Sequence, residues 1–172
     1  MTDAEVIIND PGRFSHEETI EVAAPPEVVY DTVSDITRTG EWSPICVACW
    51  WDDPREAGQV GARFTGRNEL PERTWQTRSQ VVAAERGREF AWIVGDGFVR
   101  WGFALAPAGG RTELTESWQF LPPGLQMFRE KYAADAETQI RARIEQAHTG
   151  ITQTLAAIKR VVEGQQGVAG PG

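Results

Sequence analysis

Alternation of apolar and polar residues dominates the middle of the chain, and this period of two predicts β-strands. Seven segments are predicted as strands: residues 18–22, 45–50, 60–67, 75–83, 90–94, 99–105 and 114–120. Short connections, several of them containing Gly, join consecutive segments from residue 60 onward. Such connections predict an antiparallel meander, because parallel strands need long crossovers.

The end of the chain changes to a helical period. Apolar residues recur at steps of four and three from Ile140 to Val162, which predicts one amphipathic helix over residues 135–163, ended by Gly164. Two short helices are predicted after the first strand, one from Pro25-Pro26 and one over residues 36–39, capped by Ser34-Asp35. Residues 125–132 form either a lead-in turn or the start of the long helix. The apolar stripe of the long helix needs a partner, and the apolar face of the sheet is large enough.

A single domain is predicted over residues 16–163. Residues 1–15 have weak periodicity and contain the turn signal Asp10-Pro11-Gly12, so they are expected to form a flexible arm. Residues 164–172 are rich in Gly and are expected to form a disordered tail. No internal repeat or shift in composition divides the 172 residues further.

Composition and charge narrow the possible partners. The chain is 41% hydrophobic and 24% charged, as in ordinary globular proteins, and its formal net charge is −8. So much negative charge disfavours nucleic acids and anionic membrane surfaces. No apolar run is long enough for membrane insertion, and the N-terminus lacks the features of a signal peptide. A cytoplasmic location is therefore expected.

The sequence gives little support for metal binding, redox chemistry or nucleotide binding. Cys46 and Cys49 have C-x-x-C spacing, but they fall on a predicted strand, which would place them on opposite faces. Zinc would need further ligands, and the histidines are limited to His16 and His148. No Gly-rich phosphate loop is found. The sequence therefore predicts no metal and no cofactor.

Large aromatic residues gather on one face of the predicted sheet. Four strands each carry one tryptophan on the more apolar side: Trp75, Trp92, Trp101 and Trp118. Four phenylalanines accompany them: Phe64, Phe90, Phe103 and Phe120. Small residues that would leave space beside this wall are Gly66, Ala133, Ala136 and Gly150. Solid packing is the simplest interpretation, but the volume of the aromatic side chains favours a cavity between sheet and helix.

Several segments resemble one known group of proteins. They are Val22–Tyr30, Ser34-Asp35-Ile36, Glu41-Trp42-Ser43-Pro44, Val60–Asn68, Trp75–Val81, Phe90-Ala91-Trp92 and Gly150–Glu163. Together they resemble the polyketide cyclase/dehydrase group of the START-like (Bet v 1-like, SRPBCC) superfamily over residues 17–163. The resemblance implies an α+β helix-grip fold, in which a curved antiparallel sheet of six to seven strands wraps around the long C-terminal helix. Members hold apolar ligands between sheet and helix; some cyclise or dehydrate polyketides, and others bind or transport lipids, sterols or hormones.

Two residues are candidates for acid–base chemistry. Glu116 lies between Leu114 and Trp118 on the apolar face, where desolvation would raise its pKa. His148 lies beside the helix stripe and could exchange protons near neutral pH. Such a pair suits an aldol cyclisation or a dehydration, in which one group removes a proton and the other protonates the leaving oxygen. The alternatives are a carboxylate that is solvated or paired with an arginine, and a histidine at the edge of the helix.

The other candidates would line a ligand site. They are Phe64, Asn68, Trp75, Thr77, Ser79, Trp92, Trp101, Phe103, Trp118, Ile140, Ile144 and Ile151. Asn68, Thr77 and Ser79 would hydrogen-bond a ligand, or else fill a solvated rim.

Three functions follow from these observations. The first is a protein that binds an apolar aromatic, polyketide-like or lipid-like small molecule. The second is a cyclase, aromatase or dehydratase that uses Glu116 and His148. The third is an interaction module, a homodimer formed through exposed strand or the Trp50-Trp51 surface. The first two are compatible with a monomer or a homodimer.

Overall fold

The computed structural model describes residues 11–168 and forms one curved sheet with helices on its concave side. Seven antiparallel strands have the order β1-β7-β6-β5-β4-β3-β2. They are β1 (Ser15–Val22), β2 (Cys46–Trp51), β3 (Arg63–Leu70), β4 (Arg73–Glu85), β5 (Glu89–Val94), β6 (Val99–Ala108) and β7 (Arg111–Phe120). The helices are α2 (Pro26–Val33), α3 (Pro122–Tyr132) and α4 (Ala136–Val168), with 3-10 turns η1 (Pro11–Phe14), η2 (Ile36–Glu41), η3 (Pro54–Glu56) and η4 (Ala133–Asp135).

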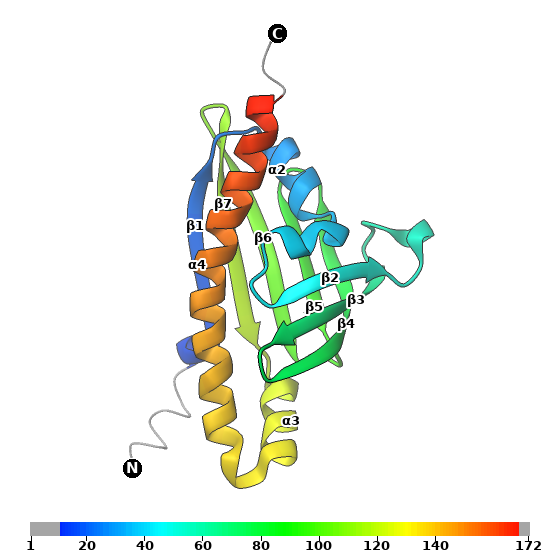
Figure 1. Cartoon of the computed structure of the whole chain (residues 1–172), viewed down its shortest axis with the longest axis vertical. Coiled ribbons are helices and arrows are strands. Elements are labelled where there is room, and N and C mark those ends of the chain that lie inside the picture. Colours follow the sequence, from blue (N-terminus) through cyan, green and yellow to red (C-terminus); the bar gives the residue numbers. More distant parts are fainter. Residues whose placement is uncertain (1–10, 169–172) are drawn as a thin grey trace.

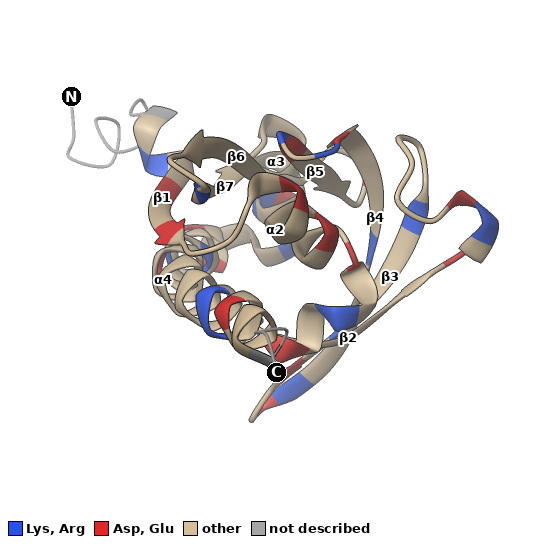
Figure 2. Ribbon diagram, turned by 90° about the horizontal axis from the view of Figure 1, so that it is seen from above, with Lys and Arg blue, Asp and Glu red and all other residues tan. Residues whose placement is uncertain are grey.

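The strands form an arc that grips the long helix. Seen from above, α2 and α4 lie on the concave side of this arc (Figure 2). Helix α4 packs along β1 and β7, while α3 packs against α4 near its start (Figure 1). This arrangement confirms the helix-grip fold and the antiparallel meander that the sequence predicts. Within the described residues, no helix is long and apolar enough to cross a membrane.

The apolar stripe of α4 supplies the main core. Ile140, Ile151, Leu155 and Ile158 are almost completely buried, and they face a sheet whose Leu114 is also fully buried. Steps of four and three residues place such side chains on one face of a helix, so the helical period alone explains this contact. Burying a side chain of this size contributes about 1.5–3 kcal/mol.

Element boundaries differ from the predictions at both ends of the domain. Pro11–Phe14 forms η1, and Ser15 already belongs to β1, so the predicted arm is ordered from residue 11 onward. Helix α4 continues through Gly164 to Val168, because a glycine in helical conformation weakens a helix without ending it. The remainder of the predicted arm and tail, residues 1–10 and 169–172, lies outside the described residues.

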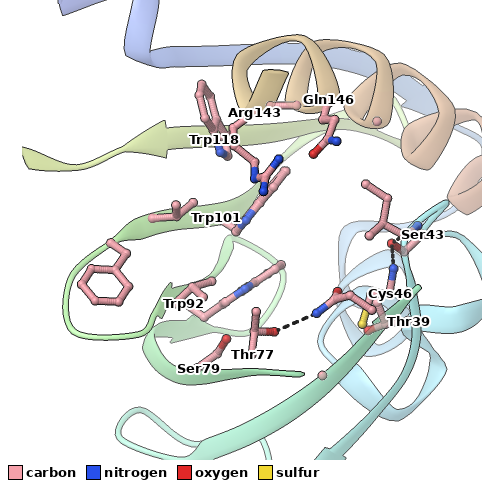
Figure 3. Close-up of a pocket in the computed structure, with 18 of the residues that line it drawn as sticks. Thr39, Ser43, Cys46, Thr77, Ser79, Trp92, Trp101, Trp118, Arg143 and Gln146 are labelled. Carbon is pink, nitrogen blue, oxygen red and sulfur yellow. Dashed lines mark hydrogen bonds between the residues drawn. The ribbon is translucent and has the colours of Figure 1, made fainter. Parts of the chain in front are cut away.

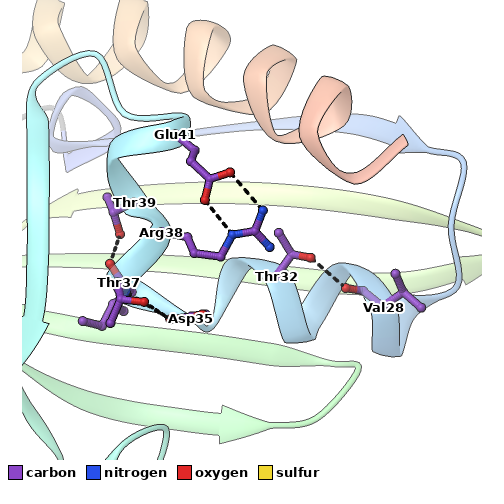
Figure 4. Close-up of polar contacts among 8 residues, drawn as sticks. Val28, Thr32, Asp35, Thr37, Arg38, Thr39 and Glu41 are labelled. Atoms are coloured by element: carbon purple, nitrogen blue, oxygen red, sulfur yellow. Dashed lines mark hydrogen bonds and ion pairs between the residues drawn. The ribbon is translucent and has the colours of Figure 1, made fainter. Parts of the chain in front are cut away.

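Local polar contacts fix the segment between β1 and β2 (Figure 4). Asp35 caps η2 as predicted, because its carboxylate accepts a hydrogen bond from the Thr37 backbone amide at 3.2 Å. The Arg38 guanidinium donates two hydrogen bonds to Glu41. At Gly40, an added Cβ would lie 2.5 Å from the Val47 carbonyl oxygen, so only glycine allows η2 to approach β2 this closely.

Candidate ligand-binding cavity

A cavity of about 570 Å³ lies between the concave face of the sheet, η2, α3 and α4 (Figure 3). Strands β2 to β7 all contribute residues to its wall. Residues two apart along each strand line it, such as Trp75 and Thr77 on β4, because alternate side chains face the same side of a sheet. This volume falls in the range of sites for drug-sized small molecules.

Tryptophans from four neighbouring strands form one side of the cavity. Trp92 on β5 pairs with Trp101 on β6, which in turn pairs with Trp118 on β7. Trp75 on β4 also lines the cavity, and so does Trp42, which follows η2. The wall is therefore aromatic and largely rigid, as the repeated tryptophans predict.

Ten of the predicted site residues lie on this wall: Phe64, Asn68, Trp75, Thr77, Ser79, Trp92, Trp101, Phe103, Glu116 and Trp118. Three of them form a small polar group, since Asn68 Nδ2 donates to Thr77 Oγ1 at 3.3 Å and Ser79 follows two residues later on β4. Their backbone positions follow from strand alternation, but a contact with ligand stays a prediction.

Glu116 is the most unusual polar residue of the cavity. Its side chain is buried, and its Oε2 atom has no hydrogen-bond partner in the described structure. Burial raises the pKa of Glu116 well above its usual value, and the negative charge of Glu18 raises it further. A protonated carboxyl group can donate a hydrogen bond, so Glu116 offers the cavity a donor as well as an acceptor.

His148 does not line the cavity, contrary to the predicted pairing with Glu116. It is exposed on α4, where its ring stacks on that of His16 with centroids 3.7 Å apart. His16 contacts Glu18, and Glu18 in turn pairs with Glu116 across β1 and β7. Two side chains therefore separate His148 from Glu116, and the two residues cannot act on one ligand atom.

The long helix presents a different face to the cavity than the sequence predicts. Ile140, Ile144 and Ile151 do not line it, because the apolar stripe of α4 packs on β1 and β7. The adjoining stripe lines the cavity instead: Arg143, Gln146, Ala147, Gly150 and Thr154. Figure 3 shows Arg143 reaching from the helix toward Trp101. Of the small residues expected beside the aromatic wall, Gly66 and Gly150 lie on it, whereas Ala133 and Ala136 do not.

The two cysteines share one face of β2, contrary to the prediction from simple strand alternation. A β-bulge at Val47 adds one residue, so Cys46 pairs with Asn68 and Cys49 pairs with Gly66. Both side chains therefore face the cavity, and their sulfur atoms are 3.1 Å apart. A bulge leaves no clear signal in a short apolar strand, which explains why alternation failed here.

A curved antiparallel sheet that encloses a cavity with a long C-terminal helix defines a helix-grip domain. The chain belongs to the family described as polyketide cyclase / dehydrase and lipid transport, whose model matches residues 13–163. This membership agrees with the resemblance seen in the sequence. No curated protein matches the chain.

One similar solved structure supports the family relationship, and others share the fold. The polyketide cyclase-like protein Cgl2372 from Corynebacterium glutamicum is 50% identical, with a TM-score of 0.68 over 89% of this chain and 93% of that chain. The di-domain aromatase/cyclase StfQ of the steffimycin biosynthetic pathway is 14% identical, with a TM-score of 0.65 over 96% of this chain and 56% of StfQ. Ara h 8.0201 is 18% identical, with a TM-score of 0.57 over 87% of this chain and 97% of that chain. At these low identities, the last two show the common fold alone.

Proposed function

We propose that this protein binds one apolar small molecule, aromatic, polyketide-like or lipid-like, between its sheet and α4. The observation that carries the proposal is the aromatic cavity of about 570 Å³ with the unpartnered Glu116 carboxyl on its wall. Leaving a buried polar atom without a partner costs about 1–3 kcal/mol, so a ligand hydroxyl or carbonyl would relieve an existing cost. The family description, which includes lipid transport, supports the same function.

Binding of 1-pyrenebutanol, a neutral aromatic probe, tests this function. Five tryptophans line the cavity, so the probe should quench their fluorescence by energy transfer and saturate at one molecule per chain. A probe of about 20 non-hydrogen atoms should bind with a Kd on the order of 10 µM. Native mass spectrometry provides the stoichiometry independently. Absence of quenching up to the solubility limit of the probe would contradict the proposal.

Catalysis is the second candidate, and Glu116 is the observation that favours it. A buried carboxyl with a raised pKa can protonate a leaving hydroxyl in a dehydration, and the carboxylate so formed can accept the proton from the adjacent carbon as the double bond forms. If so, dehydration of a β-hydroxy ketone should vanish in Glu116→Gln and persist in His148→Ala, because His148 is outside the cavity. Retention of turnover in Glu116→Gln would exclude this role for Glu116.

The third role, a dimeric interaction module, rests on the edge strand β2. Val47 and Trp50 are exposed there, and β2 has no neighbouring strand on its outer side among the described residues. A dimer at micromolar concentration in light scattering, together with no probe binding, would favour this role over ligand binding.

A further inference from the structure

We infer that the ligand is an amphipathic organic acid whose carboxylate binds between Arg73 and Arg143. The inference rests on the proposed binding function and specifies the class of ligand. Both arginines line the cavity, Arg73 from the start of β4 and Arg143 from α4. Lys131, at the end of α3, adds a third cation to the same wall.

Most arginines of this protein are paired with an acidic side chain. The nine with ion pairs are Arg13, Arg38, Arg55, Arg67, Arg86, Arg88, Arg100, Arg111 and Arg141. Within residues 11–168, those without an ion pair are Arg63, Arg73, Arg78, Arg129, Arg143 and Arg160. Four of these six are exposed, and water solvates them. The two that are partly shielded from water are Arg73 and Arg143, and both face the cavity.

Burial and like charge make this pair of arginines unusual. Burial lowers the pKa of Arg143, and the positive charge of nearby Arg73 lowers it further. Neither arginine forms a salt bridge with a carboxylate in the described part of the chain, even though the whole protein carries a net charge of −8. A bound anion would reverse the unfavourable electrostatics of both groups at once.

Aromatic contacts leave the hydrogen-bonding edges of the two guanidinium groups largely available. The guanidinium carbon of Arg73 lies 4.1 Å from the ring centroid of Trp75, and that of Arg143 lies 5.5 Å from the Phe128 ring. The Tyr132 hydroxyl raises the pKa of Arg143 and so offsets part of the lowering caused by burial and by Arg73. Each guanidinium has five N–H donors in one plane, so several remain for a ligand.

The cavity wall fits a ligand that carries a carboxylate on an apolar body. Guanidinium and carboxylate form paired parallel hydrogen bonds, and the remaining wall is mainly aromatic. Among the described residues, Glu116 is the single carboxylic acid on the wall, and its raised pKa favours the neutral form, so it does not repel an anion. The cavity therefore combines an apolar volume with an unpaired positive site.

Two probes that differ in one charge test this inference: 1-pyrenebutanoic acid and its methyl ester. A carboxylate bound by guanidinium should make the acid bind about ten- to a hundredfold more tightly than the ester. Tryptophan quenching in each titration gives the two dissociation constants under the same conditions.

Variants of the two arginines, each with a matched control, test whether the carboxylate of the acid binds between Arg73 and Arg143. Arg143→Met and Arg73→Met should each weaken binding of the acid about tenfold or more and change ester binding less than about twofold. Arg160→Met on α4 and Arg78→Met on β4 remove exposed, unpaired arginines from the same elements and should change neither constant. Ester binding also shows that each variant is folded.

The outcomes separate this inference from the proposed function. Equal affinity for acid and ester, or acid binding that is unchanged in both Arg143→Met and Arg73→Met, would overturn the inference and leave ligand binding intact. Failure of the wild-type protein to bind either probe would overturn both.

Discussion

Replacement of Gly150 by tryptophan should abolish binding of 1-pyrenebutanol while the protein stays folded. Gly150 lies on the cavity wall in α4, and a Cβ built there has no heavy atom within 4 Å. Side chains of a helix lean toward its N-terminus, so an indole at position 150 would extend over Gln146 and Ala147, which also line the cavity. We expect affinity to fall by about a hundredfold or more, equivalent to roughly 3 kcal/mol.

Two further variants control for indirect effects in that experiment. Gly164→Trp adds the same side chain to α4 at an exposed position off the cavity wall, and it should leave binding unchanged. Gly150→Ala should raise the free energy of unfolding by about 0.5–1 kcal/mol, because glycine is unfavourable inside a helix, and should also preserve binding. Full binding by Gly150→Trp would show that the ligand occupies another site.

Glu116→Met should stabilise the protein by about 1–3 kcal/mol at pH 8. The substitution removes a buried carboxyl that has an unpartnered oxygen, and methionine has a similar length and no polar atom to desolvate. Binding of ligands that hydrogen-bond to Glu116 should weaken in the same variant. Stability and function would then change in opposite directions, as is common for residues of a binding site.

The stabilisation by Glu116→Met should grow as pH rises. Because the pKa of Glu116 is raised by folding, the folded chain retains a proton that the unfolded chain has already lost. The wild-type protein therefore loses stability as pH rises above the unfolded pKa, near 4.5, and continues to lose it until the folded pKa is passed. Urea denaturation at pH 5 and pH 8 measures the difference between variant and wild type at each pH.

Glu113→Met is the matched control for this comparison. Glu113 is on the same strand, β7, but its side chain is exposed. Its replacement should change the free energy of unfolding by less than about 0.5 kcal/mol at either pH. A stabilisation by Glu116→Met that is equal at pH 5 and pH 8 would contradict the raised pKa.

Local periodicity explains why most of the fold could be predicted from the sequence. Strand alternation identified the cavity face of β4 and the tryptophan on each of four strands, because a period of two depends only on neighbouring residues. The apolar stripe of α4 and its partner, the apolar face of the sheet, were also identified correctly, but the residues of α4 that line the cavity were not. Which residues beside the apolar stripe face the cavity depends on how α4 packs against β1, and the period of the helix alone does not determine it.

The other differences between the predictions and the structure also arise from tertiary contacts. His148 contacts His16 from a strand more than a hundred residues away, and the cysteines face one side because of a bulge at Val47. Arg73 and Arg143 come from separate elements, so no motif links them before the chain folds. A second stripe of small and polar residues beside the apolar stripe was the available signal for the cavity face of α4.

The seven tryptophans allow the most direct test of the central claim, which is that a small apolar ligand occupies the cavity. In a ¹H–¹⁵N spectrum, titration with 1-pyrenebutanol should shift the indole N–H signals of cavity residues such as Trp75, Trp92 and Trp101. The signals of Trp50 and Trp51, which do not line the cavity, should stay in place. Shifts confined to Trp50 and Trp51, with the cavity signals unchanged, would contradict the account.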